Sequence, residues 1–478
     1  MRSCLYWFRN DLRLHDNLAL HQAVKKKLPL TLIYIDDDQE RTLQRGPYQK
    51  AWLHNSLMRL EEDLHQEGHR LHFFKGNAKK ILNHVIEKTG AEALYWNRCY
   101  EPELMERDGA LKKEFKERGL EVETFPGFLL MEPWELKNSS NEYFKVFTPF
   151  WKSLSQKMTI QKPLAKPHFE STKTQLGSLK IDDLHLLGHR VPDLTNQWWI
   201  GEKEAMKRLQ TFIKKGLPNY AQGRDFPGMD ATSKLSANLH FGEISPQQIL
   251  YAVDAVVQSE NDRSLNLQKE KFFSELGWRE FSYHLLFHFP ELPSKPFKPQ
   301  YASFPWKKNA RLLSLWQEGM TGYPIIDAGM RQLKQTGWMH NRIRMVVGSF
   351  LVKNLMIHWH EGEKWFFDHL VDADLANNSA SWQWVFGSGA DAAPYFRVFN
   401  PLLQSAKFDP EGEYIRTYVP ELRHLDLKYL HDPSRAPENI LRQAGIVLGT
   451  TYPHACCDLN ATRDEVLKAY QHVQKEKP

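Results

Sequence analysis

The chain has 478 residues with a formal net charge of +5 at pH 7, and 41% of its residues are hydrophobic while 25% are charged. At about 150 residues per domain this length allows two or three domains, and the globular composition excludes a small stapled fold, a fibrous repeat and wholesale disorder. No apolar run approaches the ~20 residues of a membrane helix, and Arg2, Asn10 and Asp11 interrupt the first apolar stretch too early for a secretory signal.

Short apolar runs alternate with longer helix-like segments over residues 1–130. Between two of these runs, Pro47 to Glu67 carries leucines at alternating spacings of four and three, as one face of a helix requires. The apolar runs are Cys4 to Phe8, Leu30 to Ile35, Leu71 to Phe74, Ala93 to Trp96 and Val122 to Phe125. This rhythm predicts a Rossmann-like parallel α/β domain. The Gly-x-Gly-x-x-Gly fingerprint is absent after the first run, which argues against a standard dinucleotide site there.

The periodicity fades over residues 131–200, where Pro163, Gly177 and Pro192 are among the residues that break it. This composition predicts a long ordered or semi-ordered connector. Helical spacing dominates after Trp198, and Gly337 closes one clearly amphipathic stretch. We therefore predict an α/β domain over 1–130, a connector over 131–200 and a large all-helical domain over 201–478.

A first candidate cluster lies at Glu275, Trp278 and Arg279. Their spacing of i, i+3 and i+4 places a carboxylate, an indole and a guanidinium on one helix face. This arrangement suits a planar ligand that forms hydrogen bonds. The alternative is an intrahelical ion pair between Glu275 and Arg279 beside a core tryptophan.

A second cluster follows Gly337, where Asn341, Arg344 and Met345 share one face at i, i+3 and i+4. Polar groups at a helix start favour anionic or carbonyl-bearing ligands. The alternative reading gives Asn341 a plain helix-capping role.

A third cluster comprises Asp372, Asp374 and Asn378, followed by two tryptophans, in an otherwise apolar region. Acidic residues in such a setting need partners, and Arg344 or Arg279 would supply them. A metal site is the competing reading, but no further acidic residue or histidine follows at calcium-loop spacing. We predict no metal site.

A fourth cluster runs from Tyr220 to Asp225 and from Ala231 to Ser236. Clustered hydroxyls near a helix start suit a phosphate cradle, and a capped loop is the alternative. The sequence shows neither a Gly-x-Ser-x-Gly elbow nor a His-Glu-x-x-His zinc pattern, so hydrolytic functions are disfavoured.

Read together, these segments resemble the photolyase/cryptochrome family of flavoproteins, most closely its bacterial photolyases for cyclobutane pyrimidine dimers. The resemblance starts at LYWFRNDLRLHDN (Leu5 to Asn17) and is densest from GWREF (Gly277 to Phe281) through DADLANNSASWQW to GADAAPYFRVFNP (Gly389 to Pro401). It implies an α/β antenna domain and a helical domain that binds FAD.

The resemblance also implies roles for single residues. Those expected to hold FAD are Tyr220, Thr232, Ser233, Leu235, Ser236, Glu275, Arg279, Asn341, Arg344, Asp372, Asp374 and Asn378. Those expected to carry electrons to FAD are Trp306, Trp359 and Trp382. Those expected at the DNA and its flipped-out lesion are Arg224, Trp278, Asn341, Arg342, Met345 and Trp384. Glu275 and Asn378 would act in catalysis, in which photoexcited reduced FAD passes an electron to the dimer.

Asn341 and Met345 favour the cyclobutane dimer, because photolyases for the (6-4) lesion resemble one another in carrying His at both positions. Cys99 stands where deazaflavin-binding relatives tend to carry Asp, which favours methenyltetrahydrofolate as antenna. The resemblance implies sequence-independent binding of UV-damaged DNA by a monomer without an obligate protein partner, in the cytoplasm and at the nucleoid. Two alternatives are a cryptochrome-like blue-light photoreceptor and a flavin oxidoreductase; the latter would need a nicotinamide site, for which no fingerprint appears.

Overall fold

The computed structural model describes residues 2–37, 43–188, 193–260, 262–392 and 396–475. Pro192 of the predicted connector and residues 393–395 of the last motif lie outside the described residues. The chain packs as two compact units. Unit 1 comprises Met1–Pro218 and Ser233–Pro290, and unit 2 comprises Asn219–Thr232 and Glu291–Pro478. The domain boundaries placed at 130 and 200 stay a prediction.

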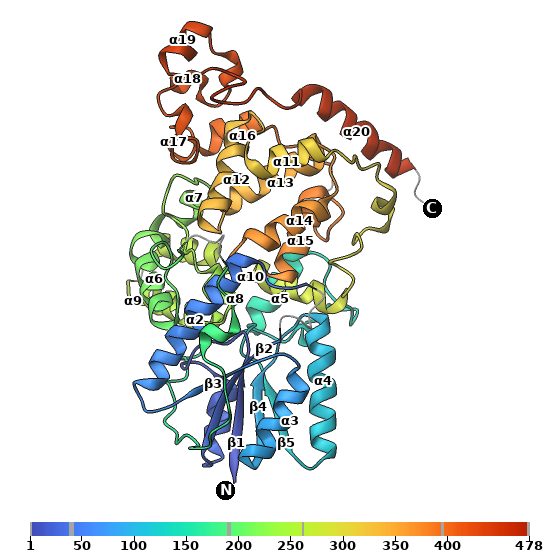
Figure 1. Ribbon diagram of the computed structural model, residues 1–478. Helices are drawn as coiled ribbons and strands as arrows, with labels where there is room; N and C mark the ends of the chain where they lie inside the picture. The colour runs from blue at the N-terminus through green and yellow to red at the C-terminus, as the bar shows by residue number, and fades with distance from the viewer. Residues whose placement is uncertain (1, 38–42, 189–192, 261, 393–395, 476–478) are drawn as a thin grey trace. The chain divides into compact units, whose positions relative to one another are not determined.

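A five-stranded parallel sheet forms the centre of the first part of unit 1 (Figure 1). The strands are β1 (Ser3–Phe8), β2 (Leu30–Asp36), β3 (Leu71–Lys75), β4 (Ala91–Asn97) and β5 (Glu121–Phe125). Their order is β3-β2-β1-β4-β5, and Leu5 pairs with Thr31 on one side and Leu94 on the other. The structure confirms the α/β prediction, because each apolar run forms one strand of the sheet.

Nine α-helices in the described residues belong to unit 1. They are α1 (Leu18–Lys25), α2 (Pro47–His65), α3 (Ala78–Thr89), α4 (Pro102–Glu117), α5 (Phe147–Lys157), α6 (Glu202–Lys215), α8 (Ser236–His240), α9 (Pro246–Glu260) and α10 (Arg263–His288), with the 3₁₀ turn η2 (Pro133–Glu135). Helices α3 and α4 pack on the sheet, where Leu82 and Phe115 join Leu5, Trp7 and Leu94 in one buried cluster. This shared burial holds the helices on that face.

The connector contains a helix that the sequence reasoning did not single out. Helix α5 buries Phe147, Phe150 and Leu154. These residues recur at intervals of three and four, so they form one apolar stripe over three turns. The surrounding prolines and glycines obscured this short stripe in a composition-based reading. Trp151 of α5 packs so closely on α10 that a Cβ at Gly277 would lie 2.4 Å from its ring.

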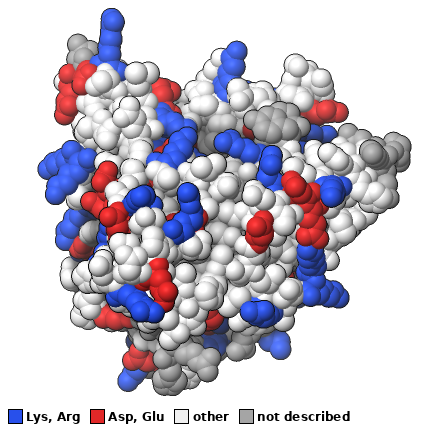
Figure 2. Space-filling view, turned by 90° about the horizontal axis from the view of Figure 1, so that it is seen from above, with Lys and Arg blue, Asp and Glu red and all other residues white. Residues whose placement is uncertain are grey.

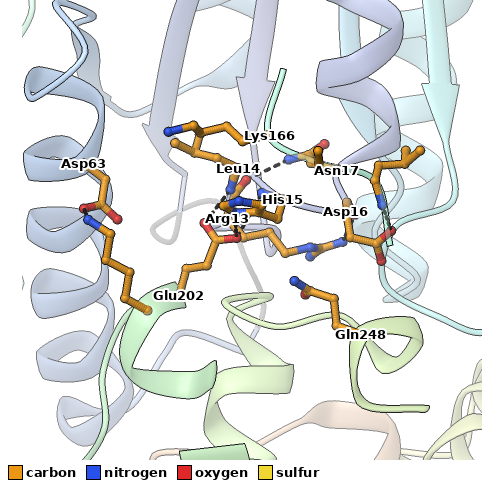
Figure 3. Close-up of polar contacts among 12 residues, drawn as sticks. Arg13, Leu14, His15, Asp16, Asn17, Asp63, Lys166, Glu202 and Gln248 are labelled. Atoms are coloured by element: carbon orange, nitrogen blue, oxygen red, sulfur yellow. Dashed lines mark hydrogen bonds and ion pairs between the residues drawn. The ribbon is translucent and has the colours of Figure 1, made fainter. Parts of the chain in front are cut away.

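The loop after β1 is tied to helices far along the chain within unit 1 (Figure 3). The Arg13 guanidinium donates to the carbonyl oxygens of Gly242 and Gly127, at 2.9 and 2.7 Å. The backbone N–H groups of Leu14 and His15 donate to the Glu202 carboxylate at the start of α6, at 2.8 and 2.9 Å. The conspicuous NDLRLHDN segment thus serves to anchor the sheet to the helices of its own unit.

His15 makes part of this anchor dependent on pH. Its Nδ1 lies 2.8 Å from Glu202 Oε1, and this hydrogen bond raises the pKa of His15 above its usual value. A raised pKa contributes stability that is complete below the unfolded pKa of about 6.5 and is lost as pH rises through the folded pKa. Because 51% of the side chain is exposed, we expect a loss of only about 0.2–1 kcal/mol as pH rises from about 6.5 through the folded pKa. Chemical denaturation of wild type and His15→Gln across this pH range checks the expected loss of stability. An identical pH dependence of the unfolding free energy in both proteins would count against a contribution of His15 to the anchor.

Unit 2 is mainly helical, as predicted. Its helices are α7 (Tyr220–Gly223), α11 (Ala310–Glu318), α12 (Pro324–Thr336), α13 (Asn341–Ser349), the π-helix η6 (Phe350–Asn354), α14 (Trp359–His369), α15 (Leu375–Phe386), α16 (Pro401–Phe408), α17 (Glu413–Tyr418), α18 (Leu427–Leu430), α19 (Glu438–Gln443) and α20 (Leu459–Lys475). One large buried cluster unites most of them, including Trp316, Val347 and Phe386. Within the described ranges, no helix is both long enough and apolar enough to cross a bilayer.

Candidate functional site

A pocket of about 300 Å³ opens in unit 2 and is lined by three residues that the sequence predicts at the DNA lesion. These are Arg342 and Met345 of α13 and Trp384 of α15. Arg342 and Met345 lie one turn apart on α13, whereas Trp384 is distant in sequence, so its convergence with them on one cavity is a property of the fold. Further lining residues that sequence reasoning did not select are Lys353, Phe396, Arg397, Phe399, Gln404 and Lys407. Aromatic rings beside cationic groups suit stacked bases and phosphates.

Two arginines of this region, Arg342 and Arg224, share one carboxylate. Arg342 Nη2 donates to Asp225 Oδ1 at 2.8 Å, and Arg224 Nε lies 3.9 Å from the same oxygen. The Arg342 guanidinium also covers the Phe408 ring at 4.3 Å. Asp225 therefore orients two predicted phosphate-binding arginines and neutralises part of their charge. On the face seen in Figure 2, Lys and Arg are scattered among Asp and Glu, so any anion affinity there is local.

The acidic cluster is buried in unit 2, and Asp372 pairs with Arg344 as one of the two predicted alternatives. Arg344 Nη2 donates to Asp372 Oδ2 at 2.8 Å, and its Nε donates to the Met339 carbonyl at 2.7 Å. Asp372 Oδ1 is buried without a hydrogen bond in the protein. A buried acceptor of this kind normally has a partner, and it fits the N–H donors of a flavin or adenine ring.

Asn378 has a fixed orientation in the same cluster. Its Nδ2 donates to the Glu363 carbonyl oxygen at 2.9 Å. Asp374 begins α15 by accepting hydrogen bonds at Oδ1 from the backbone and side chain of Asn377. Burial raises the pKa of Glu363 to about 7, and its carboxylate accepts from Ser379 Oγ. These contacts hold two predicted FAD-binding side chains in place, so the residues fit the predicted cofactor.

The three tryptophans of the predicted electron path all lie in unit 2. Trp359 and Trp382 are buried, and Trp306 is half-buried. The His358 ring lies 4.9 Å from Trp306 and 5.6 Å from Trp359, so it bridges the two. Trp382 packs on α14, where a Cβ at Gly362 would lie 2.1 Å from its ring. Sequence reasoning missed His358, although its position next to Trp359 was a usable signal.

The start of α13 differs from the alternative capping reading. His340, not Asn341, is the N-cap, and its Nδ1 accepts from the Arg342 N–H at 3.2 Å. Asn341 is the first helical residue and its side chain is not used as a cap. Burial, with the nearby positive charge of Arg224, lowers the pKa of His340 to about 3. A neutral imidazole at this position leaves Asn341 available for the ligand role implied by the resemblance.

In unit 1, the ion pair between Glu275 and Arg279, which was the alternative reading of the first cluster, does not form. Glu275 instead pairs with Lys271 at 3.2 Å, and Arg279 pairs with the buried Glu280 at 2.8 Å. Lys271 lies one turn before Glu275, and Glu280 directly follows Arg279. These two partners compete with a pairing between Glu275 and Arg279. The half-buried Trp278 stacks on Phe147 with a centroid distance of 3.8 Å.

The hydroxyl-rich segment is divided between the units. Tyr220 and Thr232 belong to unit 2, and Ser233, Leu235 and Ser236 belong to unit 1. Tyr220 is buried, and the Arg224 guanidinium lies 5.7 Å from its ring. Leu235 precedes the five-residue helix α8 without a side-chain cap, so the capped-loop alternative is not realised at this position. In unit 1, the Ser233 carbonyl accepts from Arg208 Nε at 2.8 Å.

The carboxyl edge of the sheet carries a separate ionic network. Arg9 pairs with Asp108 at 2.6 Å and lies 4.0 Å from the Trp7 ring. Cys99, on which the antenna prediction depends, is buried beside this network. Methenyltetrahydrofolate as antenna stays a prediction. Across the residues that the structure describes, no three His, Cys, Asp or Glu side chains gather as metal ligands.

Comparisons with known proteins identify the family. Residues 4–168 match the family described as DNA photolyase, and residues 272–472 match the FAD binding domain of DNA photolyase. The chain is 45% identical to deoxyribodipyrimidine photo-lyase of Agrobacterium fabrum, with 98% of each chain covered. It is 35% identical to cryptochrome-2 of Arabidopsis thaliana, over 99% of this chain and 79% of the plant protein.

A solved structure gives the same result for the fold. A bacterial class III photolyase from Agrobacterium tumefaciens superposes with a TM-score of 0.95 at 44% identity, covering 99% of this chain and 98% of that one. Identity at this level over whole chains extends to the enzyme class. The chain therefore belongs to the photolyase/cryptochrome family, as a photolyase enzyme with an FAD-binding domain.

Proposed function

We propose that this photolyase repairs UV-damaged DNA by splitting cyclobutane pyrimidine dimers in light. The observation that carries this proposal is the unit 2 pocket, which brings Arg342, Met345 and Trp384 together. An indole suits stacking on a flipped-out base, which offsets an unpairing cost of a few kcal/mol. Arg342 and Arg224 would contact phosphates, giving affinity without sequence readout.

FAD is the cofactor that this reaction requires, and the buried acidic cluster supports its binding. Within unit 2, Tyr220, Asn341, Arg344, Asp372, Asp374 and Asn378 are the residues we propose to hold it, with Thr232. When bound in its reduced form, FAD would absorb light and supply the electron that opens the dimer. Arg344 fixes Asp372, and Glu363 fixes the amide of Asn378, so both side chains meet the cofactor already oriented. The roles of Ser233, Leu235, Ser236, Glu275, Trp278 and Arg279 in unit 1 remain predictions.

Trp306, Trp359 and Trp382 would deliver electrons that keep FAD reduced. The aromatic contacts from Trp306 through His358 to Trp359 support the outer part of this path. A cryptochrome-like photoreceptor is the second candidate function, because a plant cryptochrome matches over nearly the whole chain. Met345 and Trp384 in the pocket favour repair over signalling.

The test uses purified, flavin-reduced protein with one oligonucleotide that carries a single thymine dimer and another that carries a (6-4) photoproduct. We expect restored thymine from the dimer in blue light, none in darkness and none from the (6-4) lesion. Photoreduction of FAD without restoration of either lesion would favour the photoreceptor. Restoration of the (6-4) lesion alone would refute the dimer as substrate.

A further inference from the structure

Lys353 is a buried cation of the unit 2 pocket with no assigned role. Its side chain lines the cavity, yet the residue is only 5% exposed. It lies in the π-helix η6, and single π-helical turns often occur at functional positions. Few lysines are buried without a carboxylate partner, so its surroundings decide whether it carries charge.

The described contacts of Lys353 offer carbonyl oxygen and an aromatic ring. Its Nζ donates to the backbone oxygen of Arg397 and lies 4.6 Å from the Phe396 ring centroid. Phe396 in turn stacks on Tyr470 of α20 at 4.5 Å. Lys353 therefore fastens the segment that begins at Phe396 and forms one wall of the pocket.

Two acidic residues on the helices packed against η6 have other partners. Glu363 of α14 is hydrogen-bonded to Ser379, and Glu465 of α20 pairs with Lys307 at 2.6 Å. On α13, Arg342 and Arg344 pair with Asp225 and Asp372. Besides Lys353, the charged lining residues of the pocket are Asp225, Arg342, Arg397 and Lys407.

Burial, and next the positive charge of Arg397, lower the pKa of Lys353 to about 7. The amine is thus only partly protonated near neutral pH. A negative charge brought into the pocket would favour the ammonium form, and the effect is strong where water is scarce. Anion binding at this pocket is then linked to proton uptake.

We propose that Lys353 is an anion-responsive group that takes up a proton from solvent when a DNA phosphate enters the unit 2 pocket. The proton adds to the Nζ lone pair, which converts the neutral amine to an ammonium ion and leaves the hydrogen bond to Arg397 in place. This inference rests on the proposed function for the identity of the anion. It makes DNA affinity depend on pH through one side chain.

The proton uptake can be measured directly by calorimetry. The FAD-loaded protein is titrated with the dimer-containing oligonucleotide near pH 8 in buffers of different ionisation enthalpy, which yields the number of protons bound. We expect wild type to take up a large fraction of one proton. Its affinity should fall several-fold between about pH 7 and pH 9, because the ammonium form that favours the phosphate is lost over this range.

Lys353→Arg is the matched variant, because arginine keeps the charge and the donor but stays protonated. We expect it to bind DNA with less proton uptake and a flatter pH profile. Lys353→Met should lose both the uptake and part of the affinity. Equal uptake by wild type and Lys353→Arg overturns the inference. If the protein binds the dimer-containing oligonucleotide no more tightly than an undamaged one, the proposed function fails. Proton uptake on binding the undamaged oligonucleotide at low salt then still tests the role of Lys353.

Discussion

Gly242→Ala is expected to lower the stability of unit 1 by about 2–5 kcal/mol, because overpacking costs about 1–3 kcal/mol and the left-handed backbone about 1–2 kcal/mol. Gly242 has a φ of +66°, and an added Cβ would lie 2.1 Å from the Asn10 carbonyl oxygen and 2.5 Å from Asp11 Cα. Both neighbours are backbone atoms, so the loop after β1 would have to move. That movement would break the hydrogen bond from Leu12 N to the Phe241 oxygen and the one from Arg13 to Gly242.

Gly68→Ala is the matched control for this prediction. Gly68 also has a positive φ, of +78°, but nothing lies within 4 Å of its added Cβ. The substitution Gly68→Ala should therefore lower the free energy of unfolding only by the left-handed backbone penalty, about 1–2 kcal/mol. Chemical denaturation of the three proteins, followed by far-UV circular dichroism, compares the two costs. Equal losses would show that the loop after β1 is not held as closely as the structure places it.

Trp384→Ala is expected to weaken binding of dimer-containing DNA by roughly 5- to 150-fold, because stacking of a base on an aromatic side chain contributes about 1–3 kcal/mol. Trp384 is half-buried, so one part of the indole packs in the protein while the rest lines the pocket. Binding of undamaged DNA should change far less, since no base is flipped out there. The bound FAD should remain, which its absorption spectrum reports.

Trp134→Ala serves as the control for loss of an indole elsewhere. Trp134 is 37% exposed in unit 1 and packs on Phe287. We expect its affinity for dimer-containing DNA to match wild type in the same fluorescence-anisotropy assay. A Trp384→Ala protein that discriminates damaged from undamaged DNA as well as wild type would contradict stacking at this pocket.

The sheet could be predicted because its central strands β1 and β2 are buried at every residue and read as largely apolar runs bounded by polar residues. Helix α5 was harder to predict, because its apolar stripe consists of only three residues, Phe147, Phe150 and Leu154. Local periodicity identifies a helix or a strand when the pattern repeats often enough to be distinguished from the surrounding irregular sequence.

The candidate site was predictable where a charge needed a partner. Buried Asp372 required a cation, and Arg344 is that cation. The pocket itself was not predictable, because Lys353 and Phe396 come from segments that only tertiary packing brings together. His340 replaced Asn341 as the cap because an imidazole nitrogen also accepts a backbone hydrogen bond, which the usual preference for Asn does not consider.

The action spectrum of dimer repair tests the central claim most directly. Flavin-reduced protein and the thymine-dimer oligonucleotide are irradiated at a series of wavelengths, and restored thymine is counted per incident photon. We expect restoration to follow the absorption of the bound reduced flavin in the near-UV and blue, with any antenna adding its own band, and to vanish in red light and in darkness. Restoration in darkness, or at wavelengths that the bound chromophores do not absorb, would contradict light-driven repair through FAD.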